Sequence, residues 1–167
     1  MKWIISLSLS LFSCFNLFAQ ETSSINPSLD IRTIINLKVL VINSVNLNFS
    51  FRNIDDYENG ITKTGAFEVT VKSNQNWRLT IASSDPFLIP TSPGGTSDIP
   101  SGVFGLKKTS SSNFTTLSTT QKEVANGSRG GPNKSGNKFN LDLLCNPGYL
   151  YNGQAYMCEV IFTITAD

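Results

Sequence analysis

Hydrophobic and polar residues alternate on both sides of a short polar segment, residues 73–76. Side chains of a strand point to alternate faces, so this period of two predicts two half-buried strands. Ser73-Asn74-Gln75 supplies turn residues, and we expect a hairpin with one apolar face. In that register the facing pairs are Phe67 with Ile81, Val69 with Leu79, and Val71 with Trp77. Trp77 is then a core residue, and the alternative is a tryptophan that stacks on a ligand.

The segment from residue 28 to residue 51 shows the same alternation. The apolar residues of one parity are Leu37, Val39 and Val41, followed by Leu47, Phe49 and Phe51. Asn43-Ser44 separates two expected strands. Leu40 and Ile42 occupy the opposite parity, so we expect the first strand to be covered on both faces.

Polar residues at positions 53–60 predict a solvated turn between strands, in which Gly60 takes a positive φ. The turn contains the acidic residues Asp55, Asp56 and Glu58. Their carboxylates make a calcium site the alternative hypothesis. Their spacing matches no known calcium loop, so we predict no metal site.

Serine, threonine, glycine and proline dominate residues 83–137. Only "GVFGLKK" and "NFTTLSTT" have the pattern of short strands. So long a segment with few apolar residues is either a functional loop or a poorly ordered linker.

The C-terminal region predicts two more strands, "KFNLDLLC" and "AYMCEVIFTITAD". Aligning Cys145 with Cys158 places Leu143 opposite Val160, Leu141 opposite Phe162, and Phe139 opposite Ile164. The register that joins the cysteines also matches the apolar faces, so we predict a disulfide between them. These strands and the earlier ones predict an all-β fold, an antiparallel β-sandwich of about eight short strands.

The first 19 residues have the features of a secretory signal peptide: Lys2, an apolar stretch, and a small residue, Ala19, at the expected cut. A lipoprotein box ending at Cys14 is the alternative. A polar leader at 20–27 and one domain at 28–167, with long loops at 83–137, would follow. Export predicts a periplasmic, outer-surface or extracellular location.

Composition excludes several classes of function. The chain contains no histidine, which excludes Ser-His-Asp catalysis and His-ligated zinc. Removal of the signal peptide takes away Lys2, so the 13 basic residues become 12, against 12 acidic ones. The mature chain would be close to neutral, with no overall positive charge to attract nucleic acid. No segment after residue 19 is apolar enough to span a membrane. Acid–base catalysis by Asp55 and Asp56 is possible in principle, but no nucleophile or metal set accompanies them. We therefore predict a protein that is not an enzyme and needs no cofactor.

Trp77-Arg78-Leu79 forms a Trp-x-Leu motif, and Tyr156, Val160, Phe162 and Ile164 follow in the last expected strand. Together they resemble the two motifs of the WxL domain of bacterial surface proteins, in which Trp-x-Leu is the proximal motif. The distal motif of the family, Tyr-x-x-x-Leu-Thr-Trp-x-Leu, aligns with Tyr156, Val160, Phe162 and Ile164. Phe162 stands where the family has its second tryptophan, and Ile161 where it has threonine. The resemblance covers about residues 67–167 and implies an exported β-rich domain that associates with the cell wall without covalent attachment.

The "FAQ" cleavage region resembles that of secreted proteins of Bacteroidota. The architecture is also similar to that of pilin-like and spore-coat-like sandwiches. We expect a structural, adhesive or surface-associated module whose partner is an envelope polymer or another surface protein.

Two other functions stay open. A fimbrial or coat subunit would self-assemble by strand exchange, with residues 28–42 as the donor strand. A fold that keeps this segment in its own sheet would count against it. A carbohydrate-binding module would use Tyr149 and Tyr151 as stacking groups, whereas their structural alternative is packing within a loop.

Overall fold

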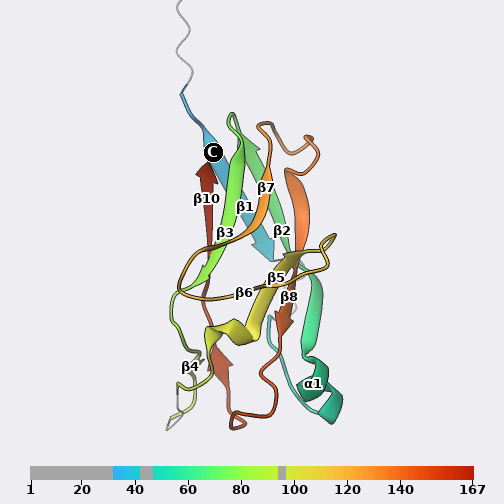
Figure 1. Ribbon diagram of the computed structural model, residues 1–167, viewed down its shortest axis with the longest axis vertical. Coiled ribbons are helices and arrows are strands. Elements are labelled where there is room, and N and C mark those ends of the chain that lie inside the picture. The colour runs from blue at the N-terminus through green and yellow to red at the C-terminus, as the bar shows by residue number, and fades with distance from the viewer. Residues whose placement is uncertain (1–31, 42–46, 94–96) are drawn as a thin grey trace, which may run out of the picture. The chain divides into compact units, whose positions relative to one another are not determined.

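The computed structural model describes residues 32–41, 47–93 and 97–167, which form an antiparallel β-sandwich (Figure 1). The signal peptide and the polar leader predicted from the sequence lie outside the described residues. The larger sheet has five strands, in the order β1 (Ile35–Val41), β2 (Ile61–Ser73), β8 (Lys138–Cys145), β5 (Phe104–Lys108) and β6 (Thr115–Thr116). The smaller sheet has the order β10 (Val160–Ala166), β3 (Trp77–Ser83) and β7 (Lys122–Gly127). The predicted all-β class is confirmed.

Shorter elements gather at one end of the sandwich. Strands β4 (Ile89–Pro90) and β9 (Tyr156–Met157) pair with each other alone. A helix, α1 (Ile54–Asn59), precedes β2, and a 3₁₀ turn, η1 (Ser101–Val103), precedes β5. Within the described ranges, no helix is long and apolar enough to cross a membrane.

Alternate residues of the two sheets meet in one core. The ring of Phe67 in β2 meets that of Phe162 in β10 edge-on, with centroids 5.4 Å apart. Side chains that are completely shielded from solvent come from both sheets: Val69, Val71, Trp77, Leu79, Ile81, Leu106 and Leu141. Removal of this apolar surface from water is the main favourable term in folding.

The predicted hairpin of β2 and β3 is wrong, because the two strands lie in different sheets. Val69 of β2 pairs with Val39 and Phe139, whereas Leu79 of β3 pairs with Ile164 and Ala125. The chain between them therefore forms an arch across the core. Parity alone cannot distinguish the two, because an arch and a hairpin both place every apolar residue of these strands inward.

Asn74 fixes the arch by bonding to the start of β1. Its backbone N–H donates to the Ile34 carbonyl (3.1 Å), and its side-chain oxygen accepts from the Ile34 N–H (2.8 Å). Its side-chain amide donates to the Arg32 carbonyl (2.6 Å). Asn74, part of the predicted hairpin turn, thus helps to hold β1 beside β2 in the larger sheet.

The predicted pairing of the two C-terminal strands is wrong for the same reason. β8 pairs with β2 and β5, and β10 pairs with β3. The inward-facing apolar residues of both strands, such as Leu141 and Phe162, nevertheless contribute to the same core or pack against it, from opposite sheets.

Two other expectations also differ from the structure. Leu40 is 43% exposed, whereas Leu37 and Val39 on the other parity pack against the core, so β1 is covered on its inner face only. β7 was not predicted, and it lies in the polar region of residues 83–137. β5 and β6 lie in the same region, within the two segments that were predicted as short strands. A register shift in its pairing with β3 leaves Val124 unpaired between Glu123 and Ala125, so the strand lacks the regular alternation.

The structure places Trp77 in the core, with 0% of its surface exposed. Its ring is parallel to that of Phe139 in the opposite sheet, with 6.1 Å between centroids and 4° between planes. Its indole N–H donates to Oδ1 of Asn137 (3.0 Å), which is also fully buried. Gly127 pairs with Trp77 in the sheet, and a Cβ at Gly127 would overlap the indole ring.

We predict that Gly127→Ala lowers the free energy of unfolding by ~1–3 kcal/mol, because the added methyl group overpacks the Trp77 site. Gly131→Ala is the matched control, since a Cβ there has no atom within 4 Å. Urea unfolding of both variants measures the difference. Equal stability of the two variants would contradict this description of the Trp77 site.

Candidate functional site

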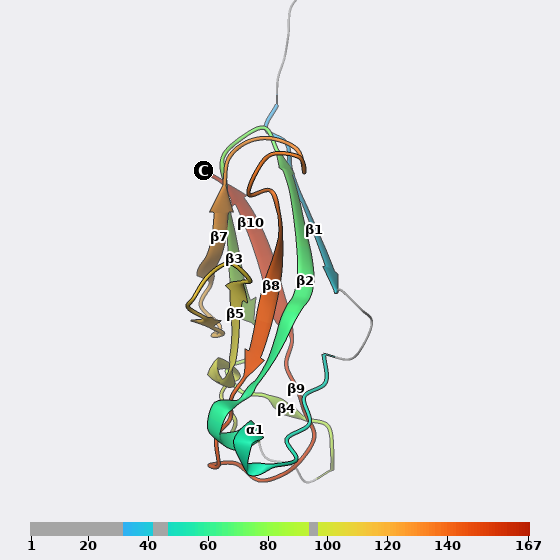
Figure 2. The same cartoon turned by 90° about the vertical axis from the view of Figure 1, so that its right-hand side faces the viewer.

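The candidate site is a cavity of about 960 Å³ at the end of the sandwich that holds α1, β4 and β9. β1 pairs only with residues 67–73 of β2, so the first half of β2 lacks this neighbour. β10 likewise begins at Val160, and the chain before it pairs with β4. Loops replace strands here. Figure 1 shows α1 at one side of this end and β4 at the other, and Figure 2 shows α1, β4 and β9 together at it. The volume lies near the top of the range for small-molecule sites, ~300–1,000 Å³.

Most residues that line the cavity are apolar, and many are aromatic. The aromatic lining residues are Phe49, Phe51, Tyr57, Phe67, Phe104, Tyr151 and Tyr156. The interior wall includes buried aliphatic residues from β8 and from the chain around β4, namely Leu88, Ile99 and Leu143. Arg52 is the one lining residue with a charged side chain among those described.

Helix α1 forms where the sequence predicted a turn. The side chain of Asn53 accepts from the Asp56 N–H (2.9 Å), and Oδ2 of Asp56 accepts from the Asn53 N–H (3.2 Å). This reciprocal capping satisfies backbone groups at the start of the helix. Gly60 ends it with φ of 71°, and a Cβ there would lie 2.7 Å from the Cys145 carbonyl oxygen.

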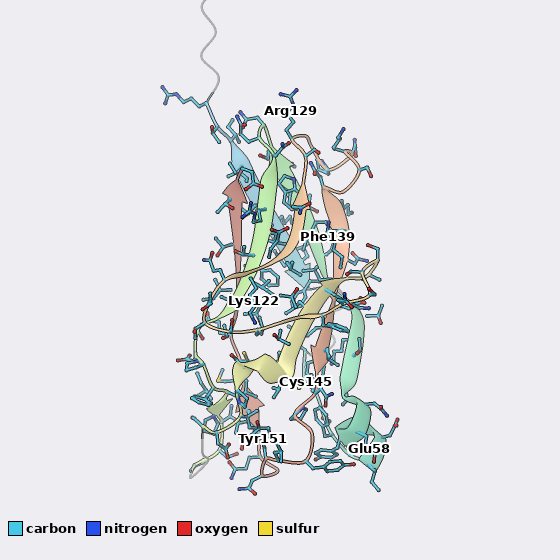
Figure 3. The ribbon with its side chains drawn as sticks, in the orientation of Figure 1. Glu58, Lys122, Arg129, Phe139, Cys145 and Tyr151 are labelled. Atoms are coloured by element: carbon cyan, nitrogen blue, oxygen red, sulfur yellow. The ribbon has the colours of Figure 1, made fainter. Side chains whose placement is uncertain are left out.

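The carboxylates that suggested a calcium site form bonds within this segment. Oδ2 of Asp56 also accepts from the Arg52 N–H (2.8 Å), and Oδ1 of Asp55 accepts from the side-chain amide of Asn59 (2.7 Å). Glu58 lies on the same short helix, at the lower right of Figure 3. The described residues include no group of three or more acidic or cysteine side chains that could hold a metal ion.

A row of rings fixes α1 to the loop of residues 146–155. The ring of Tyr57 lies between that of Phe51, at 5.2 Å, and that of Tyr149, at 5.4 Å. The Tyr149 hydroxyl donates to the Ile54 carbonyl (3.1 Å). These contacts within the protein fix the position of Tyr57 and Phe51 in the aromatic wall of the cavity.

The structure separates the two tyrosines that were predicted to face a ligand. Tyr151, at the lower end of the sandwich in Figure 3, lines the cavity and is half-buried. Tyr149 does not line it, although 60% of its surface is exposed, and it acts instead as the partner of Tyr57.

The predicted disulfide between Cys145 and Cys158 is wrong, since both are free thiols. Cys145 ends β8 in the larger sheet, and Cys158 precedes β10 in the smaller one, so the expected shared register does not exist. Both nevertheless line the cavity. Burial, with a smaller contribution from Cys158, raises the pKa of the Cys145 thiol to about 12. Burial also raises the pKa of Cys158, as do Asp85 and Glu159.

Sequence reasoning did not identify Phe49, Phe51, Tyr57 or Arg52 as parts of a site. The signal that could have found them is the density of aromatic residues between positions 49 and 57, which spans the end of an expected strand and the expected turn at 53–60. Tyr156, which was aligned with the distal motif, is half-buried at the cavity wall.

No family model matches the chain, and no curated protein does. The resemblance to WxL domains stays a prediction from the sequence motifs around Trp77 and Phe162.

We predict that iodoacetamide modifies Cys158 faster than Cys145 in the native protein at pH 8. The thiolate is the nucleophile, and a pKa of about 12 keeps Cys145 protonated until far above that pH. Differential alkylation without reductant, followed by peptide mass spectrometry, gives the two rates and shows whether both thiols are free. A disulfide-linked peptide pair, or faster modification of Cys145, would contradict the structure.

Proposed function

We propose that this protein is an exported, non-enzymatic binding module of the bacterial cell envelope, and that it holds its ligand in the aromatic cavity. The observation that carries the proposal is the cavity itself, a space with aromatic walls at the open end of the sandwich. Aromatic side chains supply large contact areas with little loss of conformational entropy. A structural or adhesive role at the surface, as in WxL-like proteins, would use this end for attachment.

The bonds of the acidic residues support a function without catalysis. Asp55 and Asp56, the candidates for acid–base chemistry, accept hydrogen bonds within their own segment. The thiols that line the cavity have raised pKa values, which disfavours the nucleophilic thiolate.

The pairing of β1 counts against the strand-exchange alternative. β1 pairs with β2 along its whole length, from Ile35 to Val41. Asn74 also holds the residues just before it. A donor strand for a neighbouring subunit would have to lose all of these bonds.

Carbohydrate binding is the second candidate. Tyr151 and Tyr156 line the cavity beside the amides of Asn152 and Gln154. Aromatic faces and amide groups together suit sugar rings, which carry apolar faces and hydroxyl edges.

The test measures how much protein is retained on isolated cell envelopes, for wild type and for single substitutions at two adjacent residues. We expect Tyr151→Ala to weaken retention about tenfold or more, as for a central aromatic contact. Leu150→Ala is the matched control, because Leu150 is 86% exposed and does not line the cavity. Thermal unfolding should show that both variants are folded. Equal retention of wild type and Tyr151→Ala would contradict binding through the cavity.

A further inference from the structure

We propose that the ligand of the cavity is an anionic amphiphile, with a hydrocarbon chain against the apolar walls and one acidic head group on Arg52. This inference rests on the proposed function, because it assumes that the cavity is a binding site. It adds the chemical class of the ligand.

The buried apolar part of the lining favours a hydrocarbon chain. It consists of Phe67 and Leu143 from the larger sheet and of Leu88 and Ile99 from the chain on either side of β4, each at most 5% exposed. Phe49 and Phe104, whose rings meet edge-on at 5.6 Å, extend the same apolar lining. An apolar chain in this space gains free energy with every methylene that leaves water.

The polar residues at the lining are poorly suited to a ligand that is polar along its whole length. The amides of Asn48, Asn152 and Gln154 are on exposed residues, whereas the buried lining residues are apolar apart from the Cys145 thiol. A sugar inserted into the interior would leave hydroxyl groups without partners. The gradient from apolar interior to polar surface matches a molecule with one apolar end and one polar end.

The charge at the lining favours an acidic head group. Arg52 is exposed, and no carboxylate of the described residues forms an ion pair with its guanidinium. Oδ2 of Asp56 accepts hydrogen bonds from the backbone N–H groups of Arg52 and Asn53, not from the Arg52 guanidinium. A guanidinium presents parallel N–H donors that fit a carboxylate or a phosphate, and it repels a cationic head.

The experiment uses the exported protein and three probes that share one chain: oleate, monooleyl phosphate and oleyl alcohol, the first two below their micellar concentrations and the alcohol below its solubility limit. Isothermal titration calorimetry measures their affinities for wild type, Arg52→Gln and Arg129→Gln. Arg129→Gln is the matched control, because Arg129 is an exposed arginine at the opposite end of the sandwich (Figure 3).

We expect saturable binding of all three probes, with an acidic probe bound more tightly than the alcohol. Arg52→Gln should weaken the binding of oleate or of monooleyl phosphate about tenfold, the effect of one charge-assisted hydrogen bond, and leave the alcohol unchanged. The larger loss identifies the head group as carboxylate or phosphate. Arg129→Gln should change none of the affinities, and a bound probe should slow alkylation of Cys158.

Three results would overturn the inference in different ways. Equal affinity for all three probes, insensitive to Arg52→Gln, would remove the acidic head and leave an apolar binding site. Binding of sugar oligomers in place of the probes, lost in Tyr151→Ala, would remove the amphiphile but support the proposed function. No binding of probes, together with unchanged envelope retention of Tyr151→Ala, would overturn both.

Discussion

The packing of Trp77 between the two sheets is the interaction on which the rest of the structure depends. Its ring lies on Phe139 of β8, and its N–H bonds to Asn137. The Asn137 carbonyl accepts from the Val71 N–H (2.8 Å), and its side-chain amide donates to the carbonyls of Gly130 and Gly131. One buried contact thus joins β2, β3, β8 and the loop after β7. Without Asn137, an unsatisfied indole N–H in this core would cost ~1–3 kcal/mol.

The other end of the sandwich is open because its strands differ in length. β2 has 13 residues and β1 has 7, so β2 extends beyond its edge partner. A bulge in β2 near Gly65 shifts its register with β8, and buried Asp142 stabilises this bulge by accepting from the Gly65 N–H (2.8 Å) and the Thr109 hydroxyl (2.6 Å). The closed end supplies stability, and the open end leaves room for the aromatic cavity. This division puts the proposed binding site at the end of the sandwich where loops replace strands.

The sequence contains enough information to predict which residues face inward, but not which strands are neighbours. The parity of Phe67, Val69 and Val71 was correct, as was that of Trp77, Leu79 and Ile81. The predicted pairing of β2 with β3 was wrong, because an arch satisfies the same parity as a hairpin. The predicted disulfide was wrong because it assumed that the two C-terminal strands pair. Helix α1 could have been predicted, since Asn53-x-x-Asp56 has the spacing of a capping box. The cavity could not have been predicted, because it depends on where strands from distant parts of the chain end.

Hydrogen–deuterium exchange with and without a saturating ligand, first oleate, tests most directly whether binding is confined to the open end. The account predicts slower exchange in residues 47–52 and 146–158, which surround the cavity, and unchanged exchange in residues 127–137 beside Trp77. Protection centred on residues 127–137, or no protection around the cavity, would contradict it.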